Sequence, residues 1–369
     1  MPGITRCGFF RYNIQNGFFI RQPGISRGQE VFMGKMRWGL LGSGKILDRW
    51  LKGFRQVEDA EIAGIASRTI ETAQRRAIEC GVADAMTYDD MLRRKDIDVM
   101  YIPVPHPAHK ELAIRALEAG FPVLVEKPAA VTASDWVEMS AAAKANHVFL
   151  MEAVWTCCFP AIRKMLEMIS SGAIGEVRCV QAAFAGRIAD SYRGRLTDPM
   201  DAGGALLDVG VYNLHFAQMV YGRSPVRLAS LASIGTDEMH LQVDEQAAYI
   251  GQYENGALSI LTSAIRTAMP DTAWVYGTEG MIRIPVYWKA SEFEIRSGGR
   301  SETVSLPVPQ HTEGITDEGF QFEIRHVQEC IRSGLSESPL VPHSATEAVL
   351  TQCDELRQQW GLRFPFENN

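Results

Sequence analysis

The sequence predicts an α/β protein with two domains, and three observations predict this fold class. Strand-like apolar runs alternate with helical segments between Met36 and residue 155, which is typical of βαβ units in a doubly wound parallel sheet. A Gly-x-Gly turn follows the first of these runs. Beyond residue 155, β-like runs follow one another directly, which indicates an α+β domain with a large, open, mostly antiparallel sheet. A chain of 369 residues is long enough for two such domains.

The first half supplies the parallel sheet. Helical spacing of apolar residues predicts helices at Ala108–Ala119 and Ala133–Ala145. Gly120 and Asn146 are the expected C-terminal caps of these helices. The strand-like runs are Met36–Leu41, Glu61–Ser67, Asp98–Val104, Pro122–Glu126 and His147–Met151.

The second half begins with a helix at Ala161–Ser171, closed by Gly172, and a strand at Val177–Gly186. A further helix is expected at Ala205–Tyr221. Asn255-Gly256 is the signature of a type I′ hairpin turn. The later runs are Val226–Ile234, Gln246–Tyr253, Ala257–Ala264, Ala273–Tyr276, Met281–Pro285, Glu292–Ile295 and Thr303–Val308, followed by helices at Asp317–Ser333 and Ser344–Trp360. These patterns place a nucleotide-binding domain at 36–155 and a substrate-binding domain at 156–369.

Residues 1–35 are expected to be an extension outside the fold. They carry five basic side chains and one acidic side chain, as an Arg-rich transit peptide does. The alternative, which we favour, is a misassigned start with Met33 or Met36 as the initiator. Residues 29–31, Gln-Glu-Val, can be encoded by a sequence containing a bacterial ribosome-binding site.

Composition limits the class of partner. The remaining residues carry 32 basic and 43 acidic side chains, and such an acidic body argues against binding nucleic acid. No apolar run approaches the ~20 residues of a membrane helix. The seven cysteines are scattered, without a C-x-x-C pair, which favours reduced thiols in a cytoplasmic protein and no metal site.

The turn after the first strand predicts a dinucleotide site. The expected contacts are Gly42, Ser43, Gly44, Lys45 and Ile46. The first glycine permits the tight turn, and the second lets the backbone approach a pyrophosphate at the helix N-terminus. Leu47 occupies the third glycine position, so the fingerprint is incomplete.

The second strand favours NADP over NAD. NAD-specific sites place an acidic residue at the end of this strand to bind the ribose 2′-hydroxyl. Here the strand ends in Ser67-Arg68. A hydroxyl and a guanidinium suit a 2′-phosphate, which arginine binds through two parallel hydrogen bonds.

Four further motifs carry a resemblance to a known family. In order they are Pro105-His106-Pro107-Ala108-His109, Val125-Glu126-Lys127-Pro128, Leu150-Met151-Glu152-Ala153-Val154-Trp155 and Gly203-Gly204-Ala205-Leu206-Leu207-Asp208-Val209-Gly210-Val211-Tyr212. Together they resemble the glucose–fructose oxidoreductase/inositol dehydrogenase family over residues 36–364. The resemblance is greatest to the branch of dimeric dihydrodiol and NADP-dependent D-xylose dehydrogenases, because Tyr212 stands where inositol dehydrogenases typically carry histidine.

The resemblance implies a catalytic set of Lys127, Asp208 and Tyr212. Lys127 ends a strand at the carboxyl edge of the sheet, where ligands bind in open α/β folds, and Asp208 and Tyr212 share a helix face. A phenol is a poor acid–base group at neutral pH unless a cation stabilises its phenolate, and Lys127 is the cation we expect. Trp155 is either a core residue or, as the resemblance implies, part of the substrate pocket.

The same motifs extend the expected cofactor site. It includes Pro103, Glu126, Lys127 and Pro128, with a cis peptide between the last two. His106 and His109 either line the cofactor cleft or cap the structure beneath it.

The resulting hypothesis is an NADP(H)-dependent oxidoreductase that transfers hydride between nicotinamide and a CH–OH carbon of a small polyol, aldose or trans-dihydrodiol. The alternatives are another sugar dehydrogenase of the same family with tightly held cofactor, and an NADP-binding sensor without turnover. A homodimer is expected, because an open sheet face exposes apolar surface that a monomer would leave in water.

Overall fold

The computed structural model describes residues 34–188, 193–235, 242–308 and 319–368, and Lys35–Asn369 form one compact unit. The predictions for residues 1–33, and the start of the helix predicted at Asp317, lie outside the described residues.

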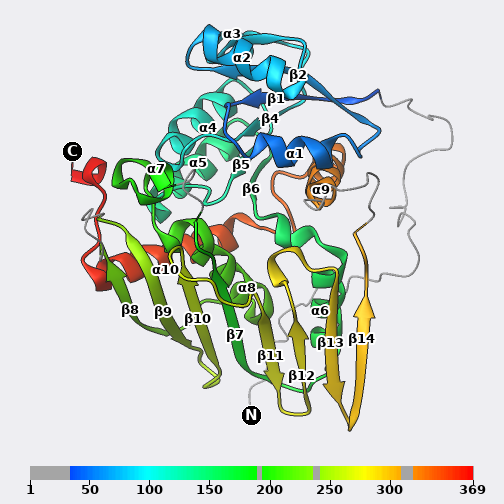
Figure 1. The fold of residues 1–369 in the computed structure, drawn as a ribbon. Coiled ribbons are helices and arrows are strands. Elements are labelled where there is room, and N and C mark those ends of the chain that lie inside the picture. The colour runs from blue at the N-terminus through cyan, green and yellow to red at the C-terminus, as the bar shows by residue number, and fades with distance from the viewer. Residues whose placement is uncertain (1–33, 189–192, 236–241, 309–318, 369) are drawn as a thin grey trace, which may run out of the picture. The chain divides into compact units, whose positions relative to one another are not determined.

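The first sheet has the order β3-β2-β1-β4-β5-β6, and all its paired strands are parallel (Figure 1). This is the doubly wound Rossmann order, in which ligands bind where the strand order reverses. Here that point lies between β1 and β4. The strands are β1 (Met36–Leu41), β2 (Ala60–Ser67), β3 (Ala85–Thr87), β4 (Val99–Ile102), β5 (Val123–Glu126) and β6 (Leu150–Ala153).

Both faces of this sheet are covered. Successive residues of β1 show this, because their side chains pack in different hydrophobic cores. Trp38 and Leu40 pack in a cluster with Trp50, while Leu41 packs in a second cluster with Trp136. The helices of this half are α1 (Leu47–Phe54), α2 (Ile70–Cys80), α3 (Tyr88–Arg93), α4 (His109–Glu118) and α5 (Ala133–Ala145).

Two local features differ from the predictions. The strand β3 was not predicted, because it is only three residues long. Asn146 is the C-terminal cap of α5, as predicted, but it is not the left-handed residue. Asn146 keeps a negative φ and donates from Nδ2 to the Ala142 carbonyl at 2.9 Å, and His147 takes the left-handed conformation (φ 55).

The second sheet has the order β14-β13-β12-β11-β7-β10-β9-β8 and is mostly antiparallel, as predicted; β7 and β10 are its parallel pair. Its strands are β7 (Val177–Ala185), β8 (Arg227–Ile234), β9 (Asp244–Gln252), β10 (Leu258–Ala264), β11 (Ala273–Gly277), β12 (Gly280–Ile284), β13 (Glu292–Ser297) and β14 (Arg300–Ser305).

The β9–β10 hairpin is not the predicted type I′ turn. Gly256 has a positive φ of 76 but Asn255 does not, whereas a type I′ turn needs both. The Gly256 N–H donates to the Tyr253 carbonyl at 2.8 Å, and the Tyr253 N–H donates to the Ala257 carbonyl at 2.9 Å. The loop is therefore three residues long, with glycine in the left-handed position.

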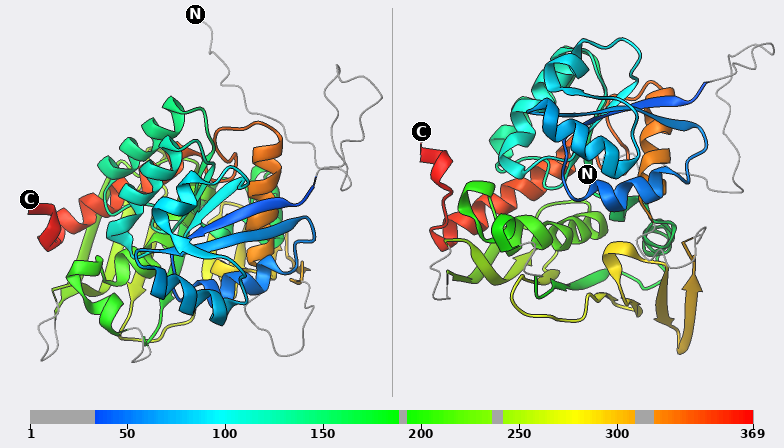
Figure 2. Two further views of the ribbon diagram at one scale, coloured as in Figure 1. Left: turned by 90° about the horizontal axis from the view of Figure 1, so that it is seen from above. Right: turned by 45° about the horizontal axis from the view of Figure 1, so that its top comes forward.

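Helices cover one face of the second sheet and return the chain to the first half (Figures 1 and 2). Ala133 N donates to Asp354 Oδ2 at 2.9 Å, and Trp136 Nε1 donates to the His343 carbonyl at 3.0 Å. These bonds join α5 to the last long helix. The helices of the second half of the chain are α6 (Pro160–Ser170), α7 (Arg193–Thr197), α8 (Val211–Tyr221), α9 (Phe320–Arg332) and α10 (His343–Trp360).

The other face of the second sheet carries exposed apolar side chains. Ile250 and Ile260 are cross-strand partners with 47% and 38% exposure, and Leu231 on β8 is 83% exposed. We expect this face to form a homodimer interface, because burying it removes apolar area from water. Ile250→Glu should convert a dimer to a monomer in sedimentation at micromolar concentration. Leu335→Glu, at an exposed leucine outside the sheet, is the control, and a monomeric parent protein would contradict the prediction.

Candidate functional site

The glycine turn lies against the loop that follows β4, at the reversal of strand order. A Cβ on Gly44 would come within 2.4 Å of the Pro103 carbonyl oxygen, and one on Gly42 within 2.9 Å of the same oxygen. Only glycine therefore allows the two loops to approach so closely. No side chain caps the N-terminus of α1; its first N–H groups, those of Leu47, Asp48 and Arg49, donate to the carbonyls of Gly44, Lys45 and Ile46, so a pyrophosphate would contact the glycine turn itself. The turn thus fits a dinucleotide.

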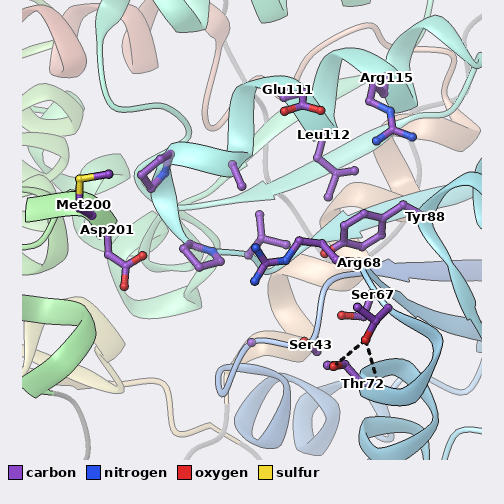
Figure 3. A pocket seen from close by; sticks show the side chains of 16 residues that line it. Ser43, Ser67, Arg68, Thr72, Tyr88, Glu111, Leu112, Arg115, Met200 and Asp201 are labelled. Atoms are coloured by element: carbon purple, nitrogen blue, oxygen red, sulfur yellow. Dashed lines mark hydrogen bonds between the residues drawn. The ribbon is translucent and has the colours of Figure 1, made fainter. Parts of the chain in front are cut away.

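A cavity of about 730 Å³ extends from this turn past the end of β2 (Figure 3). Ser67 and Arg68 line it, as predicted, and no acidic side chain stands at the end of β2. Tyr88 and Arg115 line the same cavity and were missed by sequence reasoning. Arg115 also pairs with Asp89. Burial raises the pKa of the Tyr88 phenol, whereas nearby Arg68 acts to lower it, so the phenol and the guanidinium share one end of this cavity.

A second cavity of about 720 Å³ begins at Gly44 and Lys45 and opens between the two sheets. Lys127, Asp208 and Tyr212 all line it, although they come from the end of β5 and from the region of α8. Ile46, Pro103, His106 and Glu126 line it as well. The structure therefore brings the predicted catalytic residues and part of the predicted cofactor site to one cavity.

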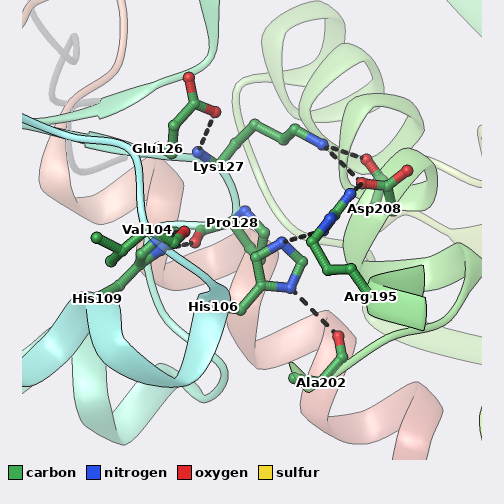
Figure 4. Close-up of polar contacts among 9 residues, drawn as sticks. All are labelled: Val104, His106, His109, Glu126, Lys127, Pro128, Arg195, Ala202 and Asp208. Atoms are coloured by element: carbon green, nitrogen blue, oxygen red, sulfur yellow. Dashed lines mark hydrogen bonds and ion pairs between the residues drawn. The ribbon is translucent and has the colours of Figure 1, made fainter. Parts of the chain in front are cut away.

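Asp208 is held by two cations (Figure 4). Lys127 Nζ donates to its backbone carbonyl at 2.6 Å and lies 3.3 Å from Oδ1, while Arg195 Nη2 donates to Oδ1 at 3.0 Å. Burial acts to raise the pKa of Asp208, but Lys127 and Arg195 outweigh it and hold the pKa well below its ordinary value. Asp208 is therefore a carboxylate that can accept hydrogen bonds from substrate hydroxyls.

The electrostatics of Tyr212 depend on several neighbouring groups. Lys127 Nζ lies 5.1 Å above the centroid of the Tyr212 ring and donates its hydrogen bonds to Asp208. Burial raises the pKa of the phenol well above its ordinary value, Glu126 and Asp208 raise it further, and Arg49 acts in the opposite direction. These surroundings favour the protonated phenol, and stabilisation of its phenolate by Lys127 stays a prediction.

Aromatic rings form much of the cavity wall. Trp155 lines the cavity and stacks on Phe320, with ring centroids 4.1 Å apart; Phe184 stacks on Trp288 at 5.1 Å. Trp155 is only 2% exposed, so both alternatives for this residue hold in part. It is a core residue with one surface toward the cavity.

His106 is a cavity residue whose ring nitrogens have distinct partners. Nδ1 lies 3.2 Å from the Ala202 carbonyl and Nε2 lies 3.4 Å from Arg195 Nη1. A carbonyl accepts and a guanidinium donates, so Nδ1 carries the proton and Nε2 accepts. Burial, and next Arg195, lower the pKa of His106 well below its ordinary value, which favours this neutral form.

His109 and Pro128 do not line either cavity. His109 is fully buried, with Nδ1 2.8 Å from the Pro128 carbonyl and Nε2 2.8 Å from the Val104 carbonyl (Figure 4). Of the two alternatives for His109, the structure thus favours support beneath the cleft. The Lys127–Pro128 peptide is cis, as predicted.

Asp244 explains the second glycine of the pair that precedes Asp208. Its Oδ2 accepts the Leu206 N–H at 2.6 Å, and a Cβ on Gly204 (φ 115) would come within 2.1 Å of Oδ1. The carboxylate thereby anchors the π-helical turn Leu206–Gly210, which carries Asp208 and continues into α8. Sequence reasoning missed this residue because it lies 36 residues beyond Asp208 on another element.

The parallel Rossmann sheet, with its glycine turn where the strand order reverses, defines the class of protein as a dinucleotide-binding oxidoreductase. Residues 36–154 match the oxidoreductase family with an NAD-binding Rossmann fold, and residues 162–283 match its GFO/IDH/MocA C-terminal domain. The chain belongs to the Gfo/Idh/MocA family.

Three relatives illustrate the similarity. The trans-1,2-dihydrobenzene-1,2-diol dehydrogenase of Mus musculus is 32% identical, over 89% of this chain and 98% of its own length. KijD10, a 3-ketoreductase from Actinomadura kijaniata solved with NADP and TDP-benzene, is 25% identical with a TM-score of 0.76, covering 88% of this chain and 98% of its own. The aldose-aldose oxidoreductase of Caulobacter crescentus, solved with glycerol, has a TM-score of 0.78 at 24% identity, covering 89% and 98%.

One property bears on membrane association. Among the helices of the described residues, none combines the length and apolar character needed to cross a bilayer.

Proposed function

We propose that this protein uses NADP(H) to interconvert a CH–OH carbon and a carbonyl in a small polyol, aldose or trans-dihydrodiol. The observation that carries the proposal is the convergence of Lys127, Asp208 and Tyr212 on a cavity that begins at the glycine turn. The relatives support it, since one is a dihydrodiol dehydrogenase and one is an aldose-aldose oxidoreductase.

The cofactor would lie along both cavities. The glycine turn would hold the pyrophosphate, and Ser67 and Arg68 would hold the 2′-phosphate. When bound, the nicotinamide supplies or accepts the hydride.

The protein's own residues would position the substrate and move its proton. Asp208 accepts hydrogen bonds from substrate hydroxyls, and the ring faces of Trp155 and Trp288 exclude water and pack against the carbon skeleton. Tyr212 Oη donates its proton to the substrate oxygen during carbonyl reduction and receives the hydroxyl proton during oxidation. Lys127 neutralises Asp208, which limits the electrostatic cost of negative charge on the phenol oxygen.

A substrate screen tests the proposal. Reduction of NADP⁺ is followed at neutral and alkaline pH with D-xylose, D-glucose, inositols and trans-dihydrodiols. Turnover with at least one compound is expected. Absence of turnover with all of them, by protein that binds NADP⁺, would contradict the proposal and favour a sensor.

We predict that Arg68 selects NADP⁺ over NAD⁺. A charged hydrogen bond to a phosphate contributes about 1.5–3 kcal/mol, so Arg68→Ala should weaken NADP⁺ binding tens-fold and leave NAD⁺ binding nearly unchanged. Calorimetric titration with each cofactor measures both constants. Arg75→Ala is the matched control, because Arg75 is an exposed arginine on α2 outside the cavity. Equal losses for the two cofactors would show that Arg68 does not contact the 2′-phosphate.

A further inference from the structure

The proposed chemistry requires two separate segments of the chain to keep a fixed position relative to each other. Lys127 lies on the loop after β5 and Tyr212 lies on α8. Both face the cavity. The element behind them is β6, whose Glu152 is 1% exposed and lines neither cavity.

Glu152 contacts the two segments at once. Its Oε1 accepts the N–H of Ala129, two residues after Lys127, at 3.0 Å. Its Oε2 lies 3.0 Å from Nε2 of His215, which is 3% exposed and three residues after Tyr212. Residues three apart on a helix share a face, so a displacement of His215 displaces Tyr212 as well.

A third contact leads away from the site. Thr346 Oγ1 on α10 donates to Glu152 Oε2 at 2.8 Å. This bond stabilises the packing of α10 and has no direct connection to Lys127 or Tyr212. It therefore offers a way to separate a general loss of stability from a loss of alignment.

The Glu152 side chain remains charged in the core. Burial acts to raise the pKa of Glu152, but the opposing effects of His215, Thr346 and the Ala129 N–H outweigh it and bring the pKa below its ordinary value. Removing the carboxylate leaves the buried groups that it contacts without their acceptor. A neutral side chain of the same shape should therefore loosen the segments that the carboxylate joins.

We propose that Glu152 is a positioning residue that fixes the Lys127 loop against the Tyr212 helix through Ala129 and His215. Misplacing reacting groups by about 1 Å can lower a rate by about a hundredfold. The proposal rests on the proposed function only in its kinetic consequence, because the alignment itself can be observed in a structure.

The test compares Glu152→Gln with Thr346→Val. Glu152→Gln should lower kcat at least tenfold and move the alkaline pH dependence of kcat, with NADP⁺ affinity within about twofold of the parent. Thr346→Val should lower the Tm but keep kcat within about threefold. Equal losses of kcat in the two variants, or an unchanged kcat in Glu152→Gln, would overturn the proposal.

Two further measurements keep the test decisive. If Glu152→Gln does not fold, His215→Gln replaces it, with the same kinetic expectation. A crystal structure of the folded variant should show the Ala129 segment displaced relative to α8; unchanged positions would overturn the proposal. A displaced segment in a protein without turnover on any polyol would contradict the proposed function and leave the positioning role intact.

Discussion

Tyr212→Phe should lower kcat by ~10²–10⁴-fold, the usual contribution of a positioned acid–base group. The substitution removes only the hydroxyl and retains the ring that Lys127 and Phe184 contact at 5.1 and 5.2 Å. Folding and NADP⁺ affinity should therefore survive, and steady-state kinetics with saturating cofactor measure the loss.

The matched control is Tyr276→Phe. Tyr276 lies on β11 outside both cavities, so the kcat of this variant should match that of the parent protein. If Tyr212→Phe kept most of the turnover, Lys127 or His106 would have to move the proton. His106 is poorly suited to that role, because its Nε2 accepts a hydrogen bond from Arg195.

Lys127→Met should produce a loss of similar size, about 10²–10⁴-fold, for an electrostatic reason. Without the ammonium group, Asp208 keeps Arg195 as its cation, and its charge opposes ionisation of the phenol more strongly. The pH profile of kcat should therefore shift to higher pH, and the maximal kcat should fall. Lys164→Met, at a partly exposed lysine on α6, is the control.

The two losses should not add in the double variant, because both residues serve one proton transfer. Tyr212→Phe/Lys127→Met should be about as slow as the slower single variant. Independent effects, which multiply in the double variant, would show that Lys127 acts on a different step, such as substrate binding.

Sequence patterns predicted the parts of this fold and site that depend on local spacing. The glycine turn, Ser67-Arg68 and the apolar runs each follow from neighbouring residues, and so does the type of the second sheet. Arg195 was not predicted because it lies in an irregular polar stretch without periodicity. Its approach to Asp208 depends on tertiary folding.

The electrostatic properties of the site could not be predicted from the sequence, for a similar reason. A motif shows that a tyrosine and a lysine are available, but the pKa of Tyr212 depends on burial and on carboxylates from other segments. The contact between His215 and Glu152 could not be predicted either, since Glu152 lies 63 residues earlier in the sequence, on β6.

The bonds between α5 and α10 determine how this chain can be divided. Residues 36–155 contain a complete parallel sheet, yet Trp136, Ala133 and Leu150 find their partners beyond residue 335. A fragment that ends at residue 155 would expose the buried face of Trp136 and leave these backbone and indole groups to water. We therefore expect residues 36–155 alone to be less stable than the same residues in the complete chain. In chimeras between relatives it should be exchanged together with its C-terminal helices.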